Sequence, residues 1–181
     1  SVADLNVTNQ GYGGIYLYQP NVPYRNGTVV IQNNTMNRLG GDFNGVVTFD
    51  LFTNSLNISN NTITRTRNES GYGAINLRGS NAGSTMIINN NTIDDMNKTY
   101  TGSYARGIYL DGITGTVGVN AQITNNTLKN FAGNAGNFNR IGIFTSSSTY
   151  VNIANNKITD NKSLNTGYLY AIYMTTSTNN T

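Results

Sequence analysis

The stretch Ile58-Ser59-Asn60-Asn61-Thr62-Ile63 occurs five times in this chain with small variations, and it decides the fold. Four further copies and one degenerate copy begin at these residues: Ile31, Ile88, Ile123, Ile153 and Val7. Successive copies start 24 to 35 residues apart. Self-similarity at a period of about 20–50 residues is typical of repeat architectures, in which each repeat forms one structural unit. The sequence therefore predicts a solenoid of stacked repeats.

A second short segment lies between successive copies and alternates apolar with polar residues. These segments are 14–18, 46–51, 74–78, 107–111, 141–145 and 171–174. Alternation with a period of two is typical of strands with one buried face. We expect that face to consist of the following residues: Ile15, Leu17, Val47, Phe49, Ile75, Leu77, Ile108, Leu110, Ile143, Ile172 and Met174.

The repeated motif itself predicts a strand, a corner and a second strand. We expect Ile58 and Ile63 to face the interior and Asn61 to make the corner, because asparagine tolerates positive φ. When coils stack about 4.8 Å apart, identical amides can hydrogen-bond along the stack. We assign this inward ladder to the first asparagine of each pair: Asn33, Asn60, Asn90, Asn125 and Asn155.

The five I-x-N-N-[TK]-[IML] corners and the G-I-x-L strands give the chain a family resemblance. It resembles the right-handed parallel β-helix superfamily, the pectin-lyase-like fold with an asparagine ladder. The resemblance covers nearly the whole chain and implies an all-β, single-stranded right-handed parallel β-helix of about six coils. It also implies that the G-I-x-L strands form the first sheet, the residues before Asn-Asn the second, and Thr-Ile the third.

We expect residues 1–181 to form one parallel β-helix domain. Solenoids normally cover their terminal strand edges with a cap, and no amphipathic capping helix is visible in this sequence. Uncapped ends favour either a longer parent chain or contact with other copies. Self-association or neighbouring domains are therefore expected partners.

The composition limits the chemistry. The chain has 11 Lys and Arg against 8 Asp and Glu and no basic cluster, so nucleic acid is not an expected partner. No run of about 18 apolar residues occurs, so no membrane span is expected. Cysteine and histidine are absent, which excludes disulfides, histidine-based triads and the usual zinc, copper and haem sites. We expect neither a metal nor a cofactor.

Two columns of side chains are expected on the outer face of the first sheet, where carbohydrate-active members of that superfamily commonly bind substrate. The first column contains Tyr16, Thr48, Asn76, Tyr109, Phe144 and Tyr173. The second contains Tyr18, Asp50, Arg78, Asp111, Ser146 and Thr175. Exposed rings bind sugars by stacking, although β propensity alone also favours aromatic residues on a sheet. We predict that a polysaccharide or another glycan binds through these residues: Tyr16, Tyr18, Asn76, Tyr109, Phe144 and Tyr173.

The second column offers a candidate catalytic set. Asp50 and Asp111 are expected two rungs apart, about 9–10 Å, near the upper limit for the carboxylates of an inverting glycosidase. Arg78 between them would act as the base of a β-elimination or as a charge clamp. The alternative is a self-neutralising surface ladder. The chain departs from the superfamily's enzymes, because it lacks the acidic cluster of polygalacturonase-like members and the calcium-binding set of the pectate-lyase type.

Sequons of the form Asn-x-Ser/Thr are frequent and fall into two groups. In the repeated corners the acceptors would be the inward ladder residues, which a glycan could not reach: Asn33, Asn60, Asn90 and Asn125. The other acceptors are expected outward or in loops, where an exported protein can carry glycans: Asn6, Asn26, Asn57, Asn68, Asn97 and Asn161.

The low charge, the lack of catalytic clusters and the uncapped ends favour an extracellular or cell-surface module. It would serve a structural or adhesive purpose, as part of a spike, filament or surface layer, and present a face rich in Tyr, Asn and Thr to glycans. The alternative is a polysaccharide lyase or glycoside hydrolase that acts at the first-sheet face. A third hypothesis is glycan recognition without turnover.

Overall fold

The computed structural model describes residues 2–3, 6–8, 14–18, 27–37, 46–49, 55–64, 73–79, 85–94, 97–98, 105–114, 121–133, 139–159 and 168–177. These residues form strands and contain no helix, so among them there is no helix that could cross a membrane. Every strand pair that they form is parallel.

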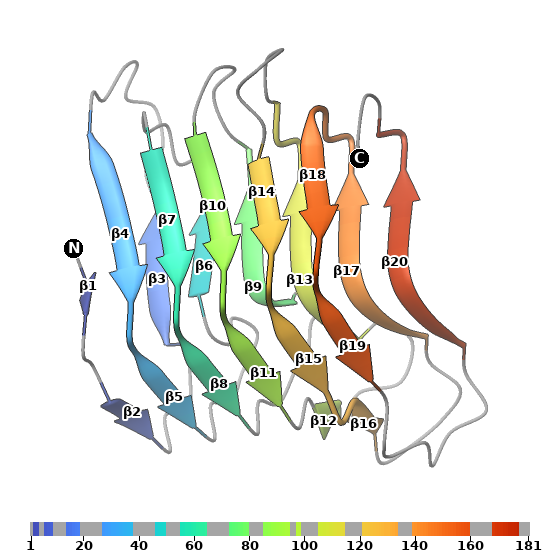
Figure 1. Ribbon diagram of the computed structural model, residues 1–181, viewed down its shortest axis with the longest axis horizontal. Helices are drawn as coiled ribbons and strands as arrows, with labels where there is room; N and C mark the ends of the chain where they lie inside the picture. The colour runs from blue at the N-terminus through green and yellow to red at the C-terminus, as the bar shows by residue number, and fades with distance from the viewer. Residues whose placement is uncertain are drawn as a thin grey trace.

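The described strands form three six-stranded sheets and one small sheet (Figure 1). The first sheet contains β3 (Ile15–Tyr18), β6 (Val46–Phe49), β9 (Gly73–Arg78), β13 (Ala105–Asp111), β17 (Arg140–Ser146) and β20 (Leu169–Thr175). The second sheet contains β1 (Val2–Ala3), β4 (Thr28–Gln32), β7 (Ser55–Ser59), β10 (Thr85–Asn89), β14 (Ala121–Thr124) and β18 (Val151–Ala154). The third sheet contains β2 (Asn6–Thr8), β5 (Thr35–Asn37), β8 (Thr62–Thr64), β11 (Thr92–Asp94), β15 (Thr127–Lys129) and β19 (Lys157–Thr159). The small sheet pairs β12 (Asn97–Lys98) with β16 (Ala132–Gly133).

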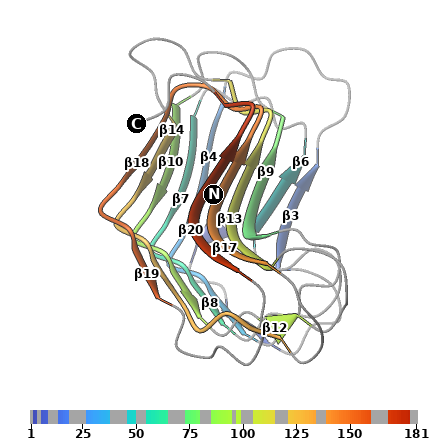
Figure 2. The ribbon, with the colours of Figure 1, turned by 90° about the vertical axis from the view of Figure 1, so that its right-hand side faces the viewer.

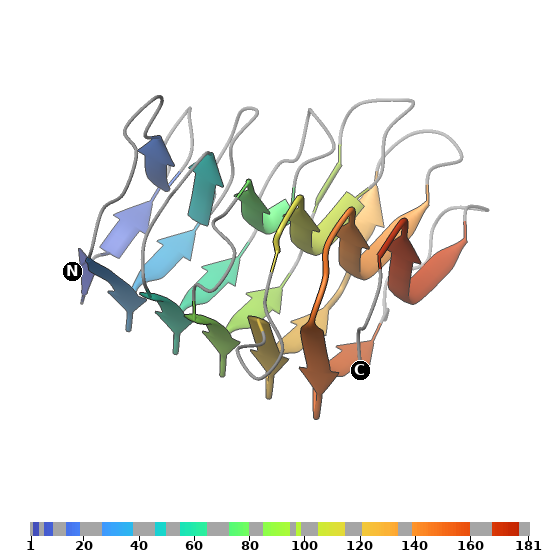
Figure 3. The ribbon, with the colours of Figure 1, turned by 90° about the horizontal axis from the view of Figure 1, so that it is seen from above.

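The chain visits the second, third and first sheets in the same order in every repeat. Within each sheet, the neighbour of a strand is the corresponding strand of the adjacent repeat. The end-on view shows the three sheets around one interior (Figure 2), and the view from above shows the repeats following one another along the molecule (Figure 3). The fold is a parallel β-solenoid, as the sequence predicts.

The interior is filled by columns of aliphatic side chains. In the second sheet the repeated isoleucines lie in register: Ile31, Ile58, Ile88, Ile123 and Ile153. The third sheet adds a buried column of Met36, Ile63, Ile93 and Leu128. The first sheet adds a buried column of Ile75, Ile108 and Ile143. The inward positions expected for Ile58 and Ile63 are confirmed.

Two residues expected on the buried face are exposed. Ile172 and Met174 lie in β20, in register with the buried residues Ile143 and Thr145. β20 is the last strand of the first sheet, so among the described strands no further rung covers these side chains. The register of Ile172 with the core residue Ile143 is therefore as predicted, but burial also requires a neighbouring rung.

The register of β6 differs from the expectation by one residue. Val46 is buried and pairs with Ile15 and Ile75, while Thr48 pairs with Leu17 and Leu77. The core-side register positions of β6 thus belong to Val46 and Thr48, and the assignment of Val47 and Phe49 to the core was wrong. Because β6 has a valine on each of its faces, its short alternation does not fix the phase, and a shift of one residue exchanges the two faces.

The asparagine ladder exists, but the second asparagine of each pair builds it. The first asparagines have φ values of 54° to 57° and are exposed: Asn33, Asn60, Asn90, Asn125 and Asn155. The second asparagines lie inside the corner, and four of them are fully buried: Asn34, Asn61, Asn91 and Asn126. The roles that we assigned to the two asparagines are therefore reversed. The left-handed residue breaks the in-and-out alternation of the strand, so the inward phase falls on the residue after it.

Each ladder amide bonds to the next one along the stack. The Nδ2-to-Oδ1 bonds are Asn34 to Asn61 (2.9 Å), Asn61 to Asn91 (2.9 Å), Asn91 to Asn126 (3.0 Å) and Asn126 to Asn156 (2.9 Å). In the central rungs the same Oδ1 also accepts a bond from the backbone N–H of the preceding ladder residue. For example, the N–H of Asn61 donates to Asn91 Oδ1 at 3.0 Å. The second N–H of the amide donates to a backbone carbonyl, as from Asn91 to Ile58 at 2.9 Å. Both donors and the oxygen of the buried amide are thus satisfied.

We expect Asn91→Ala to lower the free energy of unfolding by at least about 1–3 kcal/mol, because it leaves buried partners in two adjacent rungs without a bond. The matched control is Asn90→Gly, which keeps a residue suited to positive φ and should cost no more than about 1 kcal/mol, through the added entropy of the unfolded chain. Urea unfolding of both variants measures the difference. Equal losses in the two variants would contradict the assignment of the ladder.

Glycine is required where the first-sheet strands approach the third sheet. A Cβ on Gly107 would overlap Leu128 Cδ2 and lie 2.7 Å from the carbonyl oxygen of Gly142. A Cβ on Gly142 would lie 2.6 Å from the carbonyl oxygen of Ala171 and 2.8 Å from Ile158 Cγ2. The absence of a side chain at these two positions lets the aliphatic residues of the third sheet pack against the first.

Gly107→Ala should destabilise the protein by about 1–3 kcal/mol, because the added methyl group forces the backbone or Leu128 to move. Gly27→Ala is the control, since a Cβ there meets nothing within 4 Å. The control should be neutral or stabilising by up to about 1 kcal/mol. Thermal unfolding of the two variants distinguishes crowding from a general intolerance of alanine, and a stable Gly107→Ala protein would contradict the packing described.

Candidate functional site

The outer face of the first sheet carries a stacked column of side chains. The register Tyr16–Val47–Asn76–Tyr109–Phe144–Tyr173 runs through all six strands. At β6 this register position belongs to Val47 and not to Thr48 as expected, because the phase of β6 is shifted by one residue. The rings of Tyr109 and Phe144 are nearly parallel with centroids 5.0 Å apart, and those of Phe144 and Tyr173 are 5.3 Å apart.

Arg106 lies over two neighbouring rings in this column, those of Tyr109 and Phe144. The guanidinium carbon of Arg106 lies 4.4 Å from the ring centroid of Tyr109 and 4.6 Å from that of Phe144. A cation over an aromatic face is attracted by the ring quadrupole, more strongly when both groups are desolvated. Tyr109, Phe144 and Ile141 form a second buried cluster, with Tyr170 packed against it. The first sheet therefore has packed side chains on both of its faces.

The expected glycan-binding column is only partly exposed. Tyr109 and Phe144 have 8% of their surface exposed, whereas Tyr16 has 50% and Tyr173 has 37%. The prediction of exposed rings is wrong for Tyr109 and Phe144, because rungs above and below and Arg106 cover them. Tyr16 and Tyr173, at opposite ends of the column, remain accessible to a ligand.

Asn76 and Tyr18 complete the predicted ligand set. Asn76 is fully buried, and neither its Nδ2 nor its Oδ1 has a hydrogen-bond partner. An amide in this state costs about 1–3 kcal/mol of stability, and it cannot reach a ligand on the surface. The structure describes Tyr18 only as the backbone of the end of β3, in register with Phe49. The six predicted residues therefore do not form one continuous exposed surface.

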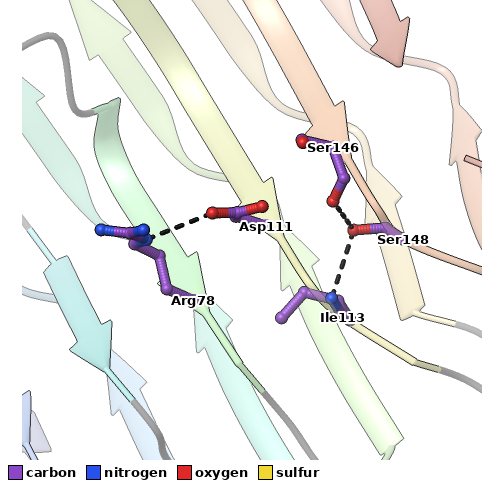
Figure 4. A network of polar contacts seen from close by, with 5 residues as sticks. All are labelled: Arg78, Asp111, Ile113, Ser146 and Ser148. Atoms are coloured by element: carbon purple, nitrogen blue, oxygen red, sulfur yellow. Dashed lines mark hydrogen bonds and ion pairs between the residues drawn. The ribbon is translucent and has the colours of Figure 1, made fainter. Parts of the chain in front are cut away.

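The candidate catalytic residues form an ion pair instead of a carboxylate pair. Arg78 Nε lies 3.3 Å from Asp111 Oδ2 (Figure 4). The register places Phe49 next to Arg78, where Asp50 was expected, and Asp50 itself lies outside the described residues. The predicted Asp50–Arg78–Asp111 column is therefore wrong in register. The carboxylate of Asp111 is held by a cation, as in the surface-ladder alternative, and a half-exposed pair of this kind contributes only about 0–1 kcal/mol.

The phenol of Tyr109 lies beside this ion pair. Burial raises its pKa above the ordinary value of 10.0, and Asp111 raises it further through its negative charge and a side-chain hydrogen bond. Arg106 and Arg78 act in the opposite direction and lower the pKa. Tyr109 is consequently a neutral hydrogen-bonding group at physiological pH and not a base.

The raised pKa of Tyr109 predicts a loss of stability in alkali. A phenol that is harder to ionise in the folded than in the unfolded state costs stability as the pH rises above about 10 through its folded-state pKa. Tyr109→Phe should remove this part of the pH dependence, while the other tyrosines contribute equally to both proteins. The measurement is the free energy of urea unfolding at about pH 8 and about pH 11. An identical pH dependence in both proteins would contradict the assignment.

A second corner follows the first-sheet strands. Left-handed residues stand in equivalent positions at its turns: Gly79 (65°), Gly112 (67°), Ser147 (48°) and Thr176 (47°). The N–H groups of Gly79, Gly112 and Ser147 donate to the next rung, as from Gly112 to the oxygen of Ser146 at 3.0 Å. This corner was not expected from the sequence. Its only signal is a small residue directly after three of the first-sheet strands, namely Gly79, Gly112 and Ser147.

Serine performs at this corner the task that asparagine performs at the other. The buried Ser148 Oγ accepts the N–H of Ile113 at 3.3 Å and donates to the oxygen of Ser146 at 2.8 Å (Figure 4). In the next rung, Ser177 Oγ donates to the oxygen of Thr175 at 3.0 Å and lies 3.4 Å from the nitrogen of Ser148. The hydroxyl of Ser148 is fully engaged and buried, so its role is structural and not nucleophilic.

Besides Asp111, the part of the chain that the structure describes contains one further acidic residue, and it is also paired. Asp94, on the third sheet, lies 3.2 Å from Lys129 Nζ and accepts a bond from Asn130 Nδ2 at 2.7 Å. Within the described ranges no group of three or more His, Cys, Asp or Glu side chains lies close enough to hold a metal ion.

Of the six sequon acceptors that we expected outward, the structure describes the side chain of one and the backbone of two more. Asn57 is half-buried on the second sheet. Asn6 and Asn97 are described only as backbone in β2 and β12. Three acceptors lie outside the described residues: Asn26, Asn68 and Asn161. In contrast, the corner acceptors that we expected to be inaccessible are all exposed: Asn33, Asn60, Asn90 and Asn125.

No protein-family model matches this chain, and no curated protein or solved structure is significantly similar to it.

Proposed function

We propose that this chain is a structural module of an exported, cell-surface protein, in which the β-solenoid acts as a rigid spacer. The proposal includes the finer features of the fold, namely right-handed winding, about six coils and membership of the pectin-lyase-like superfamily. Parallel strand connections are right-handed in nearly all proteins, which supports the winding. The parallel sheets and the asparagine ladder support the superfamily.

The observation that carries the proposal is the continuous set of bonds along the stack. Parallel backbone pairing joins every rung to its neighbours in all three sheets. The amide ladder from Asn34 to Asn156 adds side-chain bonds inside the same stack. When each repeat contacts only its neighbours, the free energy of unfolding is approximately the sum of the contributions of the repeats and of the interfaces between them. Such a rod can transmit a load or hold two ends apart.

The polar groups of the first-sheet face also favour a structural role. Asp111 is paired with Arg78, Tyr109 is neutral, and Asn76 is buried. Low charge together with abundant Asn, Ser and Thr suits an outer surface that faces water without a specific charged partner. These features support the cell-surface location that we propose.

A second candidate function rests on the exposed rings of Tyr16 and Tyr173 and on the half-exposed Arg78–Asp111 pair. They lie on the face where a polysaccharide would bind. Glycan binding there would be lost on replacement of the two tyrosines by alanine. Release of reducing ends or unsaturated products from a polysaccharide, abolished by Asp111→Asn, would favour an enzyme over a spacer.

Force spectroscopy of the full chain between two marker domains tests the spacer function. The solenoid should stay folded at low force and then unfold in discrete events, and Asn91→Ala should lower the unfolding force while Asn90→Gly leaves it nearly unchanged. Gradual extension at low force, without discrete events, would contradict the proposal. Labelling of intact source cells by an antibody against the folded module tests the location independently.

A further inference from the structure

The exposed asparagines of the first corner form a straight row along the solenoid. Asn33, Asn60, Asn90, Asn125 and Asn155 share the same left-handed backbone and the same exposure. They stand where the second sheet bends into the third, between strands such as β7 and β8 or β10 and β11 (Figure 1). Adjacent members belong to adjacent rungs, which stack about 4.7–4.9 Å apart.

Four members of this row are acceptors of Asn-x-Thr sequons. Each is followed by the buried ladder asparagine and then by threonine, as in Asn60-Asn61-Thr62. The fifth member, Asn155, is followed by Asn156 and Lys157 and is therefore not an acceptor. Because an N-linked glycan needs this tripeptide and an acceptor at the surface, the corner meets both requirements in four consecutive rungs.

We propose that Asn33, Asn60, Asn90 and Asn125 are N-glycosylation sites, so that the module carries glycans along one edge. This inference rests on the proposed export of the protein. The sugar donor is a lipid-diphosphate-linked oligosaccharide, transferred by a membrane oligosaccharyltransferase. The Nδ2 atom forms a bond to the anomeric carbon as the bond from that carbon to the diphosphate breaks, the lipid diphosphate leaves, and the amide gives up one hydrogen as a proton.

The folded rung tolerates this change because the ladder uses the other asparagine of each pair. The bonds of Asn61 and Asn91 inside the stack do not involve the side chains of Asn60 and Asn90. Asn125 Nδ2 donates to Asn89 Oδ1 at 3.0 Å. A glycosylated amide keeps one N–H, so this bond can persist.

The spacing of the row also limits how many of the four acceptors can carry a glycan in one molecule. Neighbouring acceptors are one rung apart, a distance shorter than the width of a branched oligosaccharide, so adjacent glycans compete for space. We expect individual chains to carry glycans on fewer than all four sites. The glycans would keep the edge between the second and third sheets in solvent and leave the first-sheet face as the surface for contacts.

The test is secretion of the full chain, behind a signal peptide, from a host that performs N-glycosylation. Enzymatic release of the glycans converts each modified Asn to Asp, which peptide mass spectrometry locates. Four variants each remove one sequon and keep the corner asparagine: Thr35→Ala, Thr62→Ala, Thr92→Ala and Thr127→Ala. Each should abolish modification at its own site. Lys157→Thr creates a sequon at Asn155, which has the same geometry, and should add a modified site there.

A flexible C-terminal tail that carries one Asn-Gly-Thr sequon serves as the internal reference. Modification of the tail with none at the four corners would overturn the proposal, and so would failure of Lys157→Thr to gain a glycan while the tail is modified. This readout does not depend on where the native protein resides. An antibody that fails to label intact source cells would therefore reject the proposed function without altering the result for the corner sites.

Discussion

The buried amide ladder is the interaction on which the rest of the structure depends. An amide in a coil interior must satisfy two donors and an oxygen, and the stack offers suitable partners: the next amide, a backbone carbonyl and a backbone N–H. Leucine would fill the space but leave the backbone groups unsatisfied, and serine has only one hydroxyl in place of the two N–H donors and the oxygen of the amide. The ladder requires the preceding residue to be left-handed, and asparagine again suits that position. One dipeptide thus turns the chain and joins it to the next coil.

The end of the first sheet shows the same arrangement with different residues. A left-handed residue comes first, and an inward residue follows that bonds to the rung beside it. Gly112 and Ile113 fill these positions in one rung and Ser147 and Ser148 in the next. Glycine removes the strain at the first position, while serine supplies an acceptor at the second. The first corner thus separates the second sheet from the third, and the second corner ends the first sheet.

The outer face of the first sheet illustrates how packing limits function. Tyr109 and Phe144 stack on each other beneath Arg106 and stabilise the sheet from outside. The same contacts withdraw both rings from solvent and leave Tyr16 and Tyr173 as the accessible ends of the column. At the opposite side of the molecule the corner asparagines are exposed in a regular row. Among the described residues, the groups available to a partner therefore include the two ends of the aromatic column and the row of corner asparagines.

The sequence by itself determined the repeat, the three strands of each coil and the inward aliphatic columns, because the repeat length and the period of two are local properties of the chain. Only the tertiary structure decided which asparagine of each pair is buried, since both suit a corner and the choice depends on bonds to residues 27 to 35 positions away. It also decided the phase of β6, which has a valine on each face, and so placed Phe49 beside Arg78 where the sequence had suggested Asp50. The repeat predicted that Tyr109 and Phe144 are neighbours, but their burial depends on how closely the rings stack and on the cover that Arg106 provides, which only the packed side chains show.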